Sequence, residues 1–207
     1  RSHAPKAPSV APTHPVHAKG AARAGTPTVT VNVGPKRPAP PTIASVLATP
    51  CQDTEAIPST ANLEAVEAAT LCLVNQERAR QDELPLSVNA QLGHAAQLHS
   101  QDMLQDDYFA HIAPSGETPF ERVKASGYIP NSEVGYTVGE NLAWGTLYLA
   151  TPSSIVAAWI ASPEHLANIL TADYRDTAIS VAPAAPASLA GGQAGATYTQ
   201  EFGVIQG

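Results

Sequence analysis

Apolar residues recur every three to four positions over 62–81 and again over 89–106, which predicts two amphipathic helices. Thr60 or Asn62 is placed to cap the first helix, and Asn89 is placed to cap the second. The apolar faces consist of Leu63, Val66, Thr70, Leu73 and Val74 in the first helix, and of Leu92, Ala95, Ala96, His99 and Met103 in the second. We interpret His99 on this face as a core residue with an internal partner.

Proline and glycine punctuate the next part of the chain. A short helix is predicted over 118–126, ended by Gly127 in the left-handed conformation. Thr151 and Ser162 each precede a proline at the first position of a further helix. Residues 129–139 are polar and contain glycine, which predicts a surface loop.

The spacing of apolar residues changes from a helical to a strand pattern near the end of the chain. Residues 177–181 and 198–205 alternate or are β-branched, and Gly191 and Gly192 lie between them. This pattern predicts an antiparallel hairpin with a long connection. Helices followed by strands favour a layered α+β domain over a doubly wound parallel sheet.

Composition divides the chain into two parts. The first 50 residues carry ten of the 19 prolines and few large apolar side chains. We therefore predict a disordered Pro/Ala-rich linker over 1–54 and a folded domain over 55–207. We interpret the linker histidines, His3, His14 and His17, as solvated. The first residue is an arginine, which indicates a processed product whose export signal has been removed.

Charge and cysteine content narrow the class of protein. The net charge is −7 without a basic block, which argues against nucleic acid and anionic membranes as partners. No apolar run approaches the roughly 20 residues that span a bilayer. Cys51 and Cys72 are compatible with one disulfide, although two buried thiols are the alternative. A disulfide would indicate an exported protein.

The candidate chemistry centres on Glu140, which lies among small and apolar residues in the run GENLA at 139–143. Carboxylates are rarely buried unless they are paired, so a buried Glu140 needs a partner. His111 and His165 lie in similar settings. We expect His111, Glu140 and His165 to converge on one cleft.

Seven motifs in this order resemble the CAP superfamily, which comprises cysteine-rich secretory proteins, antigen 5 and plant pathogenesis-related proteins. The chain is most similar to the short bacterial branch known as the SCP domain. The motifs are LVNQERAR at 73–80, LPL at 84–86, AAQLHSQDM at 95–103, YFAHIAPSGETPFERV at 108–123, GENLAWG at 139–145, W-x-x-SPEH-x-x-NIL at 159–170 and YTQEFG at 198–203.

The resemblance implies an α-β-α sandwich with a central antiparallel sheet, and a central cleft that holds a His/Glu tetrad. His111 and Glu140 match two tetrad positions, whereas Ser162 and Thr197 stand at the other two. His165 is typical of the bacterial branch. We therefore expect zinc or another divalent cation to have His111, His165 and Glu140 as its ligands.

The function that we expect is a secreted, non-enzymatic binding protein, extracellular or associated with the cell wall, and monomeric. Its partner would be a small apolar ligand or a component of the envelope or host, in a cleft with Tyr108, Asn141 and Tyr148. Phe109 and Trp144 are interpreted as core.

Two alternatives remain open. One is a metal-dependent hydrolase or protease with Glu140 as its catalytic residue, although HExxH and GxSxG patterns are absent. The other is a structural role, in which Glu140 and His111 only hold loops together.

Overall fold

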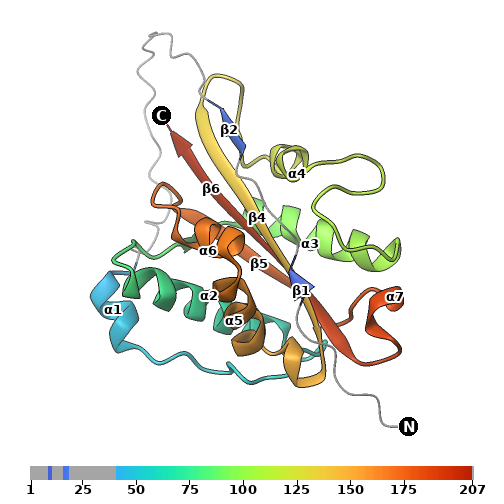
Figure 1. Ribbon diagram of the computed structural model, residues 1–207. Helices are drawn as coiled ribbons and strands as arrows, with labels where there is room; N and C mark the ends of the chain where they lie inside the picture. The colour runs from blue at the N-terminus through green and yellow to red at the C-terminus, as the bar shows by residue number, and fades with distance from the viewer. Residues whose placement is uncertain (1–8, 11–15, 19–40, 207) are drawn as a thin grey trace.

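The computed structural model describes residues 9–10, 16–18 and 41–206, which form one sheet with helices on both faces (Figure 1). The strands are β1 (Ser9–Val10), β2 (Val16–Ala18), β3 (Ser87–Val88), β4 (Gly135–Thr146), β5 (Asp176–Ala182) and β6 (Gly195–Gln206). The helices are α1 (Ile43–Ala48), α2 (Leu63–Arg80), α3 (Ala90–Gln105), α4 (Pro119–Ala125), the 3-10 turn η1 (Leu147–Ala150), α5 (Pro152–Ala161), α6 (Pro163–Leu170) and α7 (Ala187–Ala190).

The strands follow the order β1-β4-β6-β5-β3, and β2 also pairs with β4. β6 is antiparallel to both of its neighbours, β4 and β5, so the predicted hairpin of β5 and β6 is confirmed. β3 pairs with β5 in parallel. The predicted α+β sandwich is therefore confirmed, but its sheet is mixed and not purely antiparallel.

Helices α3 and α5 begin at the caps that the sequence predicts, whereas Asn62 precedes α2 without a side-chain cap bond. The Oδ1 of Asn89 accepts hydrogen bonds from the first backbone N–H groups of α3. Thr118 caps α4 in a reciprocal capping box, and Gly127 follows that helix with a φ of 83°. Thr151 caps α5. Ser162 differs, because its hydroxyl makes no cap bond to α6.

The strand β4 is the largest departure from the predicted elements. It pairs with β6 along its whole length, from Gly135 opposite Gln206 to Thr146 opposite Gly195. From residue 137 onward every residue of β4 is buried, because helices cover both faces of the sheet. A strand buried on both faces does not alternate apolar and polar residues, so its period is hidden. The loop predicted for 129–139 is therefore wrong from residue 135.

Two hydrophobic layers enclose the sheet. Helices α2, α5 and α6 cover one face with Val66, Trp159 and Ile169, among others. Helices α3 and α4 cover the other face, where Leu92 and Val123 pack against the sheet. The first layer is also joined to β4 by a hydrogen bond, since the indole Nε1 of Trp159 donates to the carbonyl of Leu142 at 3.0 Å.

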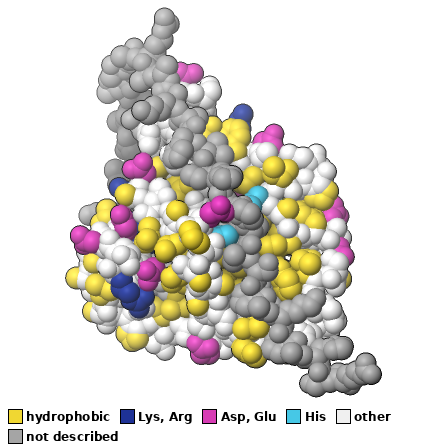
Figure 2. All heavy atoms as spheres, viewed as in Figure 1, with side chains coloured by type: hydrophobic (Ala, Val, Ile, Leu, Met, Phe, Trp, Pro, Cys, Tyr) yellow, Lys and Arg dark blue, Asp and Glu magenta, His cyan; other side chains and the backbone are white. Residues whose placement is uncertain are grey.

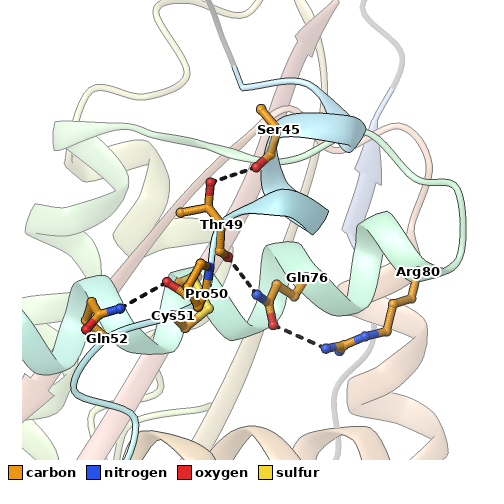
Figure 3. The surroundings of a disulfide bond; sticks show 8 residues. Ser45, Thr49, Pro50, Cys51, Gln52, Gln76 and Arg80 are labelled. Carbon is orange, nitrogen blue, oxygen red and sulfur yellow. Dashed lines mark hydrogen bonds between the residues drawn. A yellow bond between two sulfur atoms is a disulfide. The ribbon is translucent and has the colours of Figure 1, made fainter.

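The segment before α2 is folded, although the sequence predicts disorder through residue 54. Helix α1 has a capping box at Thr42, and the disulfide between Cys51 and Cys72 joins the segment after α1 to α2 (Figure 3). Gln76 of α2 donates to the carbonyl of Thr49 at 3.0 Å. The predicted disulfide is confirmed. The short strands β1 and β2 also fall in the predicted linker, whose remaining residues before 41 lie outside the described part.

The surface agrees with the acidic composition. Figure 2 shows no broad gathering of Lys and Arg side chains among the described residues of that face. None of the described helices has the length and apolar character needed to cross a membrane.

Gly139 provides a test of how closely α6 and the segment after it pack against β4. A Cβ at this position would overlap the hydroxyl oxygen of Tyr174 and lie 3.3 Å from Oδ1 of Asn168. We expect Gly139→Ala to lower the free energy of unfolding by about 1–3 kcal/mol in urea denaturation, because the core is overpacked there.

Tyr174→Phe should recover part of this loss, since it removes the atom that overlaps and that hydroxyl has no hydrogen-bond partner among the described residues. An equal cost of Gly139→Ala in both backgrounds would contradict this explanation.

Candidate functional site

Glu140 lies in the middle of β4 and is only 2% exposed. Its Oε1 accepts a hydrogen bond from Nδ1 of His111 at 2.6 Å, and its Oε2 accepts one from Nη2 of Arg122 at 3.0 Å. The Nε2 of His99 lies 3.9 Å from Oε2. The structure therefore brings Glu140 and His111 together, and it adds a buried guanidinium that the sequence analysis assigns no role. We call Glu140, His111, Arg122 and His99 the carboxylate cluster.

The carboxylate of Glu140 is ionised despite its burial. Burial alone would raise its pKa, but the hydrogen bond from His111 and the positive charge of Arg122 outweigh this effect. The pKa of Glu140 is lowered to about 2. The site therefore contains a permanent negative charge at neutral pH.

Arg122 and His99 also fix the loop that carries His111. Nη2 of Arg122 donates to the carbonyl of His111 at 2.7 Å, and Nη1 donates to the carbonyl of Glu117 at 3.2 Å. His99 bonds through Nε2 to the carbonyl of Ala110 at 3.0 Å. Three buried donors thus hold the backbone of the loop 108–117 against α3 and α4.

His99 has the role of a core residue, as predicted. Burial lowers the pKa of His99 to about 4, so its ring is neutral and Nε2 must hold the proton that it donates to Ala110. Its Nδ1 lies 3.4 Å from the hydroxyl of Tyr108, which donates to the carboxylate of Asp102. Burial and this carboxylate raise the pKa of Tyr108. Asp102, Tyr108, His99 and the carbonyl of Ala110 therefore form a series of hydrogen bonds that joins α3 to the loop.

A second carboxyl group faces Glu140 from the adjacent strand. Glu201 of β6 is the register partner of Glu140, so both side chains point to the same face of the sheet. Burial and the charge of Glu140 raise the pKa of Glu201 well above its usual value. Neither oxygen of Glu201 has a hydrogen-bond partner among the described residues, so a second ionised carboxylate would be buried there without compensation and the protonated form is favoured. The two carboxyls then share one negative charge, which Arg122 balances.

His165 has a different environment from the one predicted. It lies in the first turn of α6, and its Nδ1 is 2.7 Å from the hydroxyl of Ser162. Its carbonyl accepts a hydrogen bond from Asn141, whose side chain points to the opposite face of β4 from Glu140 because neighbouring residues of a strand alternate. These contacts place His165 beside Ser162 and Asn141, on the side of β4 opposite to the side chain of Glu140.

The described residues do not fit a divalent cation at Glu140. Both carboxylate oxygens are already bonded, and Arg122 supplies the positive charge that a metal would bring. Thr197, at another tetrad position, donates to the carbonyl of Ala184. Among residues 41–206 no three His, Cys, Asp or Glu side chains are grouped to hold a metal. The predicted cation stays a prediction.

The residues expected to line a ligand cleft have three different environments. Asn141 is fully buried, and its Oδ1 accepts from Asn168 at 3.0 Å. Tyr148 of η1 is 60% exposed. Tyr108 is half-buried against Met103 and α3. Trp144 packs in a small core cluster with Phe109, as predicted for both.

Two residues of the site are absent from the sequence-based candidates. Arg122 sits in a short helix among exposed charges, and its sequence neighbours give no sign of burial. Glu201 could have been identified, because it interrupts a β-branched and aromatic run in a strand predicted to be in the core. A carboxyl in such a strand needs a partner by the same argument that applies to Glu140.

Glu201→Gln tests the shared charge. The unfolded chain releases the proton of Glu201 near its ordinary pKa of 4.5, whereas the folded protein retains it. Glu201 therefore lowers stability progressively as the pH rises above about 4.5, by up to about 1.4 kcal/mol per pH unit. We expect Glu201→Gln to be more stable than the parent at pH 8 in thermal and urea unfolding, with a difference that shrinks toward pH 5. Glu133→Gln, at an exposed position, is the control, and a difference independent of pH would contradict the prediction.

Glu140→Gln should have the opposite effect. It leaves the guanidinium of Arg122 buried without its counter-charge, and removing one partner of a buried ion pair costs about 3–5 kcal/mol. Urea unfolding at pH 7 would measure this loss. Adding Arg122→Met should cost less than the sum of the single changes, and strict additivity would show that the two groups do not interact.

The chain resembles known proteins over the region that contains the carboxylate cluster. A Bacillus subtilis protein, YkwD, is 31% identical over 142 residues, which are 68% of this chain and 48% of YkwD. The chain thus spans about half the length of this relative. An extracellular protein containing an SCP domain from Bacillus anthracis has a similar fold, with a TM-score of 0.50 and 24% identity over 71% of this chain and 41% of that one. An outer surface protein from Borrelia burgdorferi has a TM-score of 0.51 and 16% identity over 64% of this chain and 87% of that one.

The profile of the cysteine-rich secretory protein family, CAP, matches residues 71–200. This range is more than half of the 207 residues, and it includes Glu140, His111, Arg122 and His99. The mixed sheet with helices on both faces agrees with the two solved structures. The chain belongs to the CAP family.

Proposed function

We propose that this chain is an extracellular, non-enzymatic binding module that holds a small apolar ligand, or an apolar group of an envelope component, at the loop 108–117. The observation that carries the proposal is Ile112, which is 56% exposed in a loop whose backbone is fixed by buried donors. A large apolar side chain on a rigid, exposed loop is suited to contact with a partner.

The electrostatics of the cluster favour binding over catalysis. A general base works best when its pKa lies near the working pH, whereas Glu140 has a pKa of about 2 and is almost inaccessible. Its neighbours Arg122 and His99 direct their donors to loop carbonyls. The cluster therefore supports the shape of the loop, and only His111 of its members has a side chain with appreciable exposure, at 16%.

An extracellular location is supported by two observations. The disulfide between Cys51 and Cys72 is typical of proteins from oxidising compartments. The Bacillus anthracis and Borrelia burgdorferi proteins of similar fold are described as extracellular and outer-surface proteins.

Ile112→Ser tests the proposal with a dansylated fatty acid as the apolar probe. Removing the exposed side chain from the contact should weaken binding about fivefold or more, because roughly 1 kcal/mol of apolar burial is lost. Fluorescence titration would measure the affinity, and the melting temperature should not change.

Leu84→Ser is the matched control, since Leu84 is 51% exposed on another loop. Equal affinity in the parent and Ile112→Ser proteins would exclude the loop as the binding surface. An equal loss in both variants would indicate non-specific apolar contact.

A further inference from the structure

A groove of about 670 Å³ runs along the outer edge of β5, between helices α2 and α3. These helices cover opposite faces of the sheet (Figure 1). None of the residues of the carboxylate cluster lines the groove. Its walls include Leu63, Glu67 and Leu71 from α2, and Gly93, Gln97 and Leu104 from α3.

The floor of the groove is an open strand edge. β3 pairs with β5 only at Asp176 and Thr177, after which the chain turns away at Asn89 to begin α3. No described strand pairs with the outer edge of β5 over 178–182. Residues 178–183 form the floor of the groove.

Two hydrogen bonds show which backbone groups point into the groove. The carbonyl of Thr177 accepts from the N–H of Asn89 at 2.9 Å, so the backbone of Thr177 faces the outer edge. Alternate residues of a strand present their N–H and C=O to the same edge, which assigns Ile179 and Val181 to it as well. The N–H of Val181 confirms this direction, since it donates to the carboxylate of Glu67 at 3.0 Å. Ile179 therefore directs an N–H and a carbonyl into the groove without a strand partner in the described part.

We propose that this groove binds an extended basic peptide, which adds to the edge of β5 as a further strand and places a Lys or Arg side chain against Glu64 and Glu67. Strand addition at a sheet edge uses backbone hydrogen bonds for affinity and flanking side-chain pockets for specificity. An acyl chain would fill the apolar walls but would leave the backbone groups of Ile179 unpaired, which is costly when they are covered.

The acidic side chains of the groove favour a peptide with a positive charge. Glu64 and Glu67 line it, and none of its lining residues is Lys or Arg. Burial raises the pKa of Glu67, so a cation beside this carboxylate would favour its ionised form. The incoming strand alternates its side chains between α2 and α3. On the α3 side the groove is lined by Gly93, Gln97 and Leu104.

The test uses a set of five fluorescein-labelled pentapeptides, in which one Lys moves along an otherwise alternating Val/Thr sequence. Fluorescence polarisation should detect binding of at least one register, with an affinity near the micromolar range. In the complex, the amide of Ile179 should exchange its hydrogen at least tenfold more slowly. Failure of all five peptides to bind, or binding without protection of Ile179, would overturn the proposal.

Matched variants separate strand addition from general apolar contact. Ala68→Trp fills the groove from α2 and should weaken binding at least tenfold, whereas Ala157→Trp, at an exposed position of α5 outside the groove, should leave it unchanged. Glu67→Gln keeps an acceptor for Val181 and should weaken the Lys peptide several-fold relative to the same peptide with norleucine. Methylating alternate peptide nitrogens should abolish binding. If the methylated peptide bound as tightly as the unmethylated one, pairing with β5 would be refuted. Displacement of both peptides by lauric acid to the same extent would also refute it.

Discussion

The central part of this domain depends on one buried negative charge. Removing a carboxylate from water costs several kcal/mol unless charge and hydrogen bonds replace its hydration. Glu140 obtains both from His111 and Arg122. Because Arg122 can reach Glu140 only if α4 lies against the sheet, and because the same guanidinium binds two loop carbonyls, the positions of helix, strand and loop become linked.

Glu201 shows that the cluster holds only one ionised carboxylate. Two adjacent buried carboxyls cannot both ionise beside a single guanidinium, so the pair divides into an ionised Glu140 and a protonated Glu201. Catalytic carboxyl pairs use the same division to obtain an acid and a base. Here the ionised member is enclosed by its partners, and this arrangement gives the cluster a structural task. The guanidinium also satisfies the need for positive charge that would otherwise favour a cation at this place.

The sequence predicts the helices well because their signals are local. Caps such as Asn89 and Thr151 act within one helical turn, and the apolar period of α2 and α3 is long enough to be recognised. The strand β4 has no such signal, since burial on both faces removes alternation. The pairing of Glu140 with His111 was predictable from the cost of burying a carboxylate. Arg122 was not, because its burial depends on how α4 docks and not on its neighbours in sequence.

His165 illustrates a further limit of sequence reasoning. Glu140 and Asn141 are adjacent in the chain, yet a strand directs them to opposite faces, and the carbonyl of His165 is bound by Asn141. A similar local setting for two histidines is therefore not enough by itself to predict that they share one site. The face of the sheet to which each helix docks decides this, and docking depends on the whole packed layer.

The outer edges of β4 and β5 are protected in different ways where no described strand pairs with them. In β4 the outer carbonyls at 140 and 142 are covered by donors from Asn168 and Trp159. In β5 the corresponding edge beyond β3 receives one side-chain bond, from Val181 to Glu67, and an open groove lies over the rest. Natural proteins usually protect an exposed strand edge with charge or cover, because it can pair with another chain. Glu67 supplies that charge to one residue only. The proposed basic peptide would provide the cover and the counter-charge that this edge otherwise lacks.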